Sequence, residues 1–164
     1  MLGDRWGVTE AEVARRFPCD DLVASPSLAV WRGVTVEAAP EQVWPWVRQI
    51  RLAPYSYDWI DNLGRRSPRE LRELPEPMAG EPFTASAGRP LGTVVSAAAP
   101  EHYTGRILGA VMSYVLVPDA PGRTRLLLKV VMDGGRWFAP LVSVGDLVMA
   151  RRQLLTLKRL AEAG

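Results

Sequence analysis

Cysteine and histidine are almost absent from this sequence, which contains one of each, Cys19 and His102. A single cysteine excludes a disulfide within the chain, and one cysteine with one distant histidine cannot supply the usual ligands of a zinc site. Asp20 and Asp21 follow Cys19, and their negative charge disfavours a thiolate, so we interpret Cys19 as a structural residue. We expect neither a metal nor any other cofactor.

A strong charge imbalance and a long apolar run are also missing. The formal net charge is only +2, which does not indicate nucleic acid as a partner. The richest apolar run, residues 107–117, contains Gly109 and Ser113 and is shorter than the about 20 residues that cross a bilayer. Residues 1–4 lack the charged and then apolar pattern of a leader. We therefore expect a cytoplasmic protein without a transmembrane segment.

The sequence motifs of several enzyme classes are not present. There is no Gly-x-Ser-x-Gly elbow, no P-loop and no Gly-x-Gly-x-x-Gly run. Acyl transfer by a serine triad and nucleotide binding therefore lack support from the sequence. What is present is a chain of 164 residues, the size of one domain, which can bury about 70% of the surface that its unfolded form exposes.

The first 27 residues are predicted to form a short helix and an arm. Thr9 with Glu12 three residues later is a capping box, and Pro18 ends the helix that it starts. The polar residues 19–27 then lead to the first strand. We expect residues 28–164 to form a single domain.

Short helices follow the first strand in this prediction. Residues 28–37 alternate in the manner of a strand, and Pro40 opens a helix that Pro45 would kink. The aromatic and acidic stretch from Tyr55 to Leu63 indicates a second short helix. A further capping box at residues 67–70 predicts one or two helical turns over 69–74.

The second half of the chain indicates a strand meander and then one long helix. The last strand has one apolar face, with Leu126 and Leu128, and one face expected to be mostly wet, with Arg125 and Lys129. From Pro140 onward, apolar residues recur at helical spacing. This order predicts an α+β fold in which an antiparallel sheet covers the helix. The expected strands are 83–85, 93–99, 103–107, 110–117 and 124–132.

Three stretches in this order resemble one family: APEQVWPWV at 39–47, YSYDW at 55–59 and TRL at 124–126. They are similar to the SRPBCC proteins, the START-like helix-grip superfamily, and the resemblance covers residues 22–161. In one respect the chain differs from the bacterial members of this group. A glycine-rich segment usually precedes their Tyr-Ser-Tyr-Asp run, and here residues 51–54 read RLAP. We expect the loop that borders the cavity to differ in shape.

The resemblance implies a curved antiparallel sheet wrapped around the long C-terminal helix, with short helices closing an internal apolar cavity. The superfamily includes the birch pollen allergen, plant hormone receptors, lipid-transfer domains and aromatic polyketide cyclases, so the fold by itself does not specify the function. We expect this protein to bind a small hydrophobic molecule of aromatic, polyketide-like or lipid-like character. The sequence does not indicate the oligomeric state.

Large apolar side chains and two polar ones are the candidates for the ligand site. Aromatic residues and methionine make large, adaptable apolar walls, and each of them is also a normal core residue. Arg106 and Tyr114 would orient a ligand carbonyl or carboxylate, although Arg106 fits a solvent-facing position equally well. The candidates are Trp46, Tyr55, Trp59, Arg106, Met112, Tyr114, Leu128, Trp137, Phe138 and Met149.

Two other functions stay open at this point. The first is a cofactor-free cyclase, dehydratase or lyase that uses Tyr57, Asp58 and His102 as acid and base groups. The non-catalytic interpretation is that the carboxylates of Asp58 and its neighbours lie in water or pair with Arg65, Arg66 or Arg69. In that interpretation His102 is a solvated turn residue. The second is a protein-interaction module whose cavity has closed.

Overall fold

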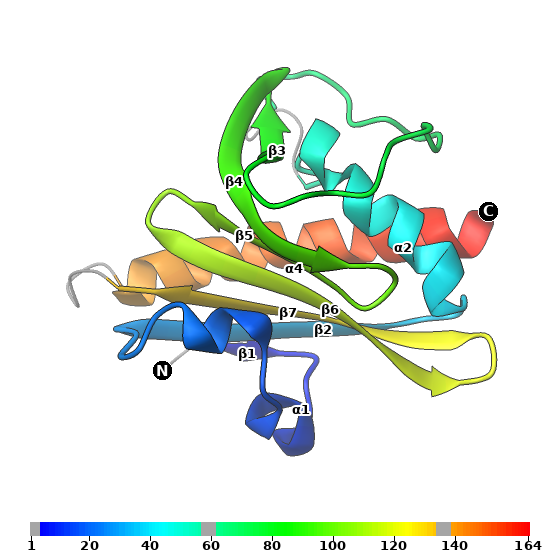
Figure 1. The fold of residues 1–164 in the computed structure, drawn as a ribbon. Helices are drawn as coiled ribbons and strands as arrows, with labels where there is room; N and C mark the ends of the chain where they lie inside the picture. The colour runs from blue at the N-terminus through cyan, green and yellow to red at the C-terminus, as the bar shows by residue number, and fades with distance from the viewer. Residues whose placement is uncertain (1–3, 57–61, 134–138) are drawn as a thin grey trace.

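A single seven-stranded sheet forms the body of the protein (Figure 1). The structure is a computed structural model that describes residues 4–56, 62–133 and 139–164, and within the last range the side chains from Met149 onward. The strands are β1 (Arg5–Trp6), β2 (Leu28–Val36), β3 (Pro82–Ser86), β4 (Arg89–Ala98), β5 (His102–Ile107), β6 (Ala110–Ala120) and β7 (Arg123–Met132).

The strand order is β1-β2-β7-β6-β5-β4-β3. Strands β3 to β7 pair with their neighbours in sequence as an antiparallel meander, and β7 then pairs with β2 over its whole length. Only the short β1, at the edge, runs parallel to its partner among the described strands. The meander predicted from the alternating pattern and the turn residues is confirmed.

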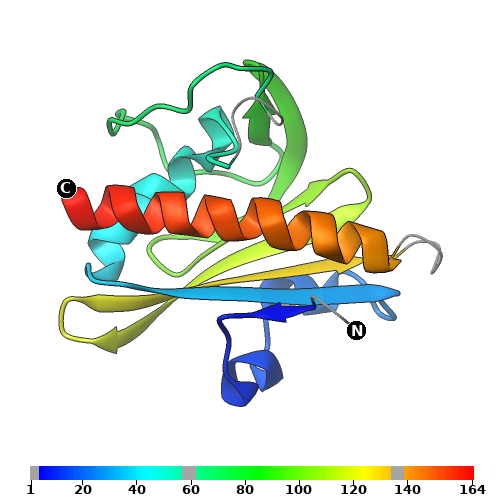
Figure 2. The ribbon, with the colours of Figure 1, turned by 180° about the vertical axis from the view of Figure 1, so that it is seen from behind.

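The long helix α4 (Ala139–Ala163) lies across one face of this sheet, as Figure 2 shows. Leu154, Leu157 and Ala161 are buried against the sheet. The sheet contributes its inward residues, including Leu128 on β7 and Tyr114 on β6. Pro140 is the second residue of α4, where its missing N–H has no partner to lose. The α+β helix-grip arrangement is therefore confirmed.

The opposite face of the sheet carries the N-terminal segment. Helix α1 (Glu10–Ala14) begins with the predicted capping box: Thr9 Oγ1 accepts a hydrogen bond of 3.1 Å from Glu12 N, and Glu12 Oε2 accepts one of 2.9 Å from Thr9 N. The 3-10 turn η1 (Pro18–Asp21) then packs on β6 and β7. Cys19 is fully buried there, and burial raises the pKa of its thiol.

The expectation of a mostly wet outer face is therefore wrong in part. The outward residues of β6 and β7 form a second apolar cluster with Phe17 and Cys19. Lys129, on the face expected to be wet, is 9% exposed and pairs with Asp20 of η1 at 2.5 Å. The arm covers this face because its apolar side chains and its acidic residues both find partners there.

Helix α2 (Pro40–Arg48) and the 3-10 turn η2 (Gln49–Leu52) lie between β2 and β3, as expected. The predicted turns of helix over 69–74 are absent: residues 65–78 have no helical structure. Ser67 does not cap a helix, since its Oγ accepts a hydrogen bond of 3.2 Å from Tyr55 N. The helix expected from Tyr55 to Leu63 lies largely on residues 57–61, outside the described residues.

The buried side chain of Gln49 organises this irregular stretch instead. Its Nε2 donates to the carbonyl of Glu70 at 2.9 Å, and its Oε1 accepts from Arg72 N at 2.9 Å. Two backbone groups that a helix would have used are thus satisfied by one distant side chain. Of the helices in the described part of the chain, none is both long and apolar enough to cross a membrane.

Candidate ligand-binding site

An apolar pocket of about 410 Å³ opens between the β3–β6 end of the sheet and α4. This volume lies in the range typical of small-molecule sites. None of the described residues that line it is charged. They are Pro54, Ser56, Thr84, Ala85, Ser86, Leu91, Ile107, Leu108, Met112, Met149, Ala150 and Gln153.

The two-residue period of the strands directs apolar side chains into this space. In the β5–β6 pair, Gly105 lies opposite Met112 and Ile107 lies opposite Ala110, so these positions share the inner face. The turn that follows β5 has positive φ at Leu108 (48°) and Gly109 (81°). This tight turn leaves Leu108 82% exposed at the rim of the pocket.

An aromatic cluster next to the pocket holds β3 close to β5. The rings of Phe83 and Tyr103 stack at 4.8 Å between centroids, and the Tyr103 hydroxyl donates to the carbonyl of Phe83 at 2.5 Å. Phe83 lies directly on the backbone of Gly105, where a Cβ atom would come within 2.1 Å of the ring. The glycine is needed for this close approach, which fixes the neighbouring Thr84 and Ala85 in the pocket wall.

Most polar groups of the pocket wall already have protein partners. Gln153 Nε2 donates to the carbonyl of Pro54 at 2.7 Å, and Thr84 Oγ1 donates to the carbonyl of Ile50 at 2.8 Å. The Oγ of Ser56 differs, because it is buried and has no hydrogen-bond partner among the described residues. A ligand oxygen or nitrogen would satisfy it.

Six of the ten expected ligand residues are buried or partly buried on the inner side of the fold. Met112 and Met149 line the pocket. Trp46, Tyr55, Tyr114 and Leu128 are packed in the core and do not line it. The Tyr55 hydroxyl accepts from Gln49 Nε2 at 2.7 Å, so it is engaged within the protein. Trp59, Trp137 and Phe138 lie outside the described residues, as do the expected catalytic groups Tyr57 and Asp58.

Arg106 and His102 are placed on the outer face of the sheet, away from the apolar pocket. Their partners across the β5–β6 ladder are Val111 and Val115, which belong to the outer apolar cluster. Arg106 is exposed, which agrees with the solvent-facing alternative for this residue, and it does not line the apolar pocket. His102 is partly buried beside Glu101 and Val115, and burial lowers the pKa of its imidazole.

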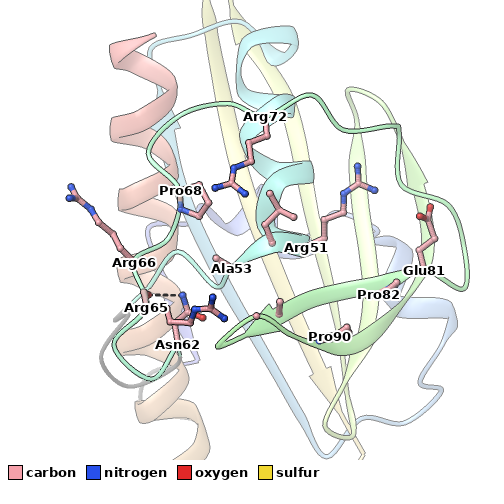
Figure 3. A pocket seen from close by; sticks show the side chains of 13 residues that line it. Arg51, Ala53, Asn62, Arg65, Arg66, Pro68, Arg72, Glu81, Pro82 and Pro90 are labelled. Carbon is pink, nitrogen blue, oxygen red and sulfur yellow. Dashed lines mark hydrogen bonds between the residues drawn. The ribbon is translucent and has the colours of Figure 1, made fainter.

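A second pocket, of about 460 Å³, was not predicted from the sequence (Figure 3). It lies between η2, the loop after Asn62 and the β3–β4 hairpin. Four arginines line it, and we call it the arginine pocket: Arg51, Arg65, Arg66 and Arg72. Residues 51–72 contain five arginines, and this density was the available signal in the sequence.

Comparison with known proteins gives a fold and no function. No family model matches the sequence, and no curated protein matches it significantly. A protein from Rhodobacter sphaeroides superimposes with a TM-score of 0.58 at 19% identity, covering 84% of this chain and 95% of the other. KanY gives 0.56 at 17% identity (82% and 97%), and MLL2253 from Mesorhizobium loti gives 0.54 at 17% (82% and 97%). These similarities agree with the helix-grip fold that the sequence resemblance implies.

Proposed function

We propose that this helix-grip protein binds a small hydrophobic molecule, aromatic, polyketide-like or lipid-like, in the pocket between the sheet and α4. The observation that carries the proposal is a space of about 410 Å³ whose described lining is uncharged and includes two methionines. The lining also includes the hydroxyl of Ser56, for which the described residues offer no partner. Apolar walls with one or two polar groups are typical of sites that orient a mainly apolar ligand.

The energetics favour an apolar occupant. Each methylene that moves from water into such a pocket contributes about 0.8 kcal/mol to binding. Met112 from the sheet and Met149 from the helix face the same space, and unbranched thioether side chains adapt to ligands of different shape. The Ser56 hydroxyl supplies one hydrogen bond, which would fix the orientation of a ligand rather than its affinity.

The position of His102 counts against the enzymatic alternative. A cyclase or dehydratase needs its acid and base within hydrogen-bonding reach of one substrate, and His102 lies on the opposite face of the sheet. Tyr57 and Asp58 remain as hypothetical groups for this chemistry. If Asp58→Asn retains ligand binding and the protein never alters its ligand under turnover conditions, the enzymatic alternative is wrong. The volume beside Met112 favours a ligand site over a closed interaction module.

Native mass spectrometry of the purified protein, with organic extraction of whatever accompanies it, tests the proposal. We expect an additional mass that is lost on denaturation and that belongs to a mainly apolar compound. A bare protein that also fails to take up added apolar compounds would contradict the proposal.

A further inference from the structure

The arginine pocket and the apolar pocket share part of their lining. Ala85 of β3 lines both of them, and the consecutive residues Ala53 and Pro54 line one each. A molecule long enough to pass these residues would therefore have one end in each pocket. The two pockets differ sharply in chemistry, because every charged residue of the pair lies on the arginine side.

Among the described residues, the arginines of this pocket have no carboxylate partners. The structure has seven ion pairs among the described residues, and none of them includes Arg51, Arg65, Arg66 or Arg72. Glu81 is the acidic residue of the described lining, and its Oε1 accepts a hydrogen bond of 2.6 Å from Met78 N. Within the described lining, the positive charge therefore exceeds the negative charge.

Two of these arginines have only carbonyl partners within the described chain. Arg65 Nη1 donates to the carbonyl of Ala87 at 2.7 Å, and Arg51 Nη2 donates to the carbonyl of Pro75. The Nε of Arg51 is buried without a partner among the described residues. Arg72 reaches over the pocket from the loop, whereas Arg66 points away from it (Figure 3). These guanidinium groups therefore still have N–H donors that can bind an anion.

Buried amides hold the backbone of these arginines in place. Asn62, which is 3% exposed, donates from Nδ2 to the carbonyl of Arg65 at 2.7 Å and accepts at Oδ1 from Ala87 N at 2.6 Å. Gln49 holds the backbone N–H of Arg72 in the same way. An anchored backbone limits the space in which the guanidinium groups move, so less conformational entropy is lost when a ligand binds.

We propose that the arginine pocket holds the carboxylate or phosphate head of an amphipathic ligand whose apolar part lies in the neighbouring apolar pocket. This inference rests on the function proposed above and specifies the ligand as an acidic amphiphile. Arginine suits the head because its planar guanidinium binds carboxylate and phosphate through paired hydrogen bonds. The apolar pocket by itself would leave such a charge without a partner, which is costly.

Calorimetric titration of three ligands with the same ten-carbon chain tests the inference: decanoic acid, decyl phosphate and decyl alcohol. We expect the wild-type protein to bind both acids at least about tenfold more tightly than the alcohol, because a hydrogen-bonded charge contributes about 1.5–3 kcal/mol. The advantage should shrink as salt increases, since the pocket is open to solvent.

Arg72→Gln and Arg51→Gln should reduce the affinity for the acids and leave that for the alcohol unchanged. The side chain of Arg72 is exposed, so its replacement should not disturb folding. Arg106→Gln is the matched control, since Arg106 is also exposed but lies on the outer face of the sheet. It should change neither affinity.

The outcomes separate this inference from the proposed function. Equal affinity for decanoic acid and decyl alcohol in the wild type would overturn the inference and leave the proposed function standing. Inorganic phosphate that binds as tightly as decyl phosphate would also overturn it, because the site would then hold a free anion. If no compound with a ten-carbon chain binds the wild type, both the inference and the proposed function fail.

Discussion

The hydroxyl of Tyr114 on β6 donates a hydrogen bond of 2.6 Å to Oε1 of Gln153 on α4. The other end of the same amide donates to the carbonyl of Pro54. One buried side chain thus connects the sheet, the long helix and the segment that separates the two pockets. Tyr114 was expected to contact the ligand, and the structure gives its hydroxyl a place in the framework around the pocket.

Replacing Gln153 with leucine should destabilise the protein. The change keeps the volume of the side chain approximately and removes both hydrogen bonds, so we expect the free energy of unfolding to fall by about 1–3 kcal/mol. Urea denaturation followed by circular dichroism measures this. Tyr114→Phe is the control, because it removes only one of the two bonds and should have a smaller effect. Equal stability of Gln153→Leu and the wild type would contradict this role.

The pairing of Glu12 on α1 with Arg125 on β7 should make stability depend on pH in the acid range. Arg125 donates to both carboxylate oxygens of Glu12, at 2.7 and 2.9 Å, and these bonds hold the pKa of Glu12 below its ordinary value of 4.5. Their contribution is complete above that value and is lost as the pH falls through the lowered pKa of the folded state.

Glu12→Gln should therefore lower the free energy of unfolding at neutral pH by about 1–3 kcal/mol and reduce its decline in acid. Urea denaturation between pH 7 and pH 3 provides the measurement. Glu10→Gln is the control, since Glu10 pairs with Arg5 in an exposed position. If both variants keep the pH profile of the wild type, Glu12 does not anchor the arm.

His102 should affect stability near pH 6 without affecting the ligand. Burial lowers the pKa of its imidazole, so the folded state binds a proton less readily than the unfolded state. Stability is then complete above the ordinary pKa of 6.5 and declines as the pH falls below it. His102→Gln should flatten this decline and leave ligand affinity unchanged. Loss of binding in this variant would place His102 in the ligand site after all.

Gly105→Ala should destabilise the aromatic cluster beside the pocket. The added methyl group would collide with the Phe83 ring, and overpacking of this kind costs about 1–3 kcal/mol. Phe83→Ala removes the ring that the added methyl group would meet, so the cost of Gly105→Ala should be smaller when both changes are combined. Thermal or urea unfolding of the four proteins measures this coupling. Purely additive effects would show that the close contact is not important.

The fold was predictable where local periodicity determined it and unpredictable where a distant side chain intervened. The strands and α4 follow from alternation and helical spacing, which depend only on neighbouring residues. The capping box at Ser67 and Glu70 failed because Tyr55 and the buried Gln49 form hydrogen bonds with this loop. Covering of the outer face depends on contacts such as Lys129 with Asp20, 109 residues apart in the chain.

The candidate site was likewise predictable only where it depends on the local periodicity of a strand. Met112 could be assigned to the inner face because it alternates with its neighbours on a regular strand. The side chain of Arg106 also alternates with its neighbours along a strand. Its pairing with Val111 assigns it to the outer face, and this register cannot be seen in the sequence. The arginine pocket combines residues from a turn, an irregular loop and a hairpin, so only its density of arginine was visible beforehand.

Titration with the neutral fluorescent dye Nile red tests the central claim, that the pocket beside Met112 binds apolar molecules. The wild type should bind one dye saturably, and Met112→Trp should lose this binding because the indole fills the space. Met78→Trp is the control, since Met78 is 69% exposed and lies outside the pocket. Leu91→Trp serves as a second blocking variant if Met112→Trp does not fold. Unchanged dye affinity in a folded blocking variant, or no binding by the wild type, would contradict the account.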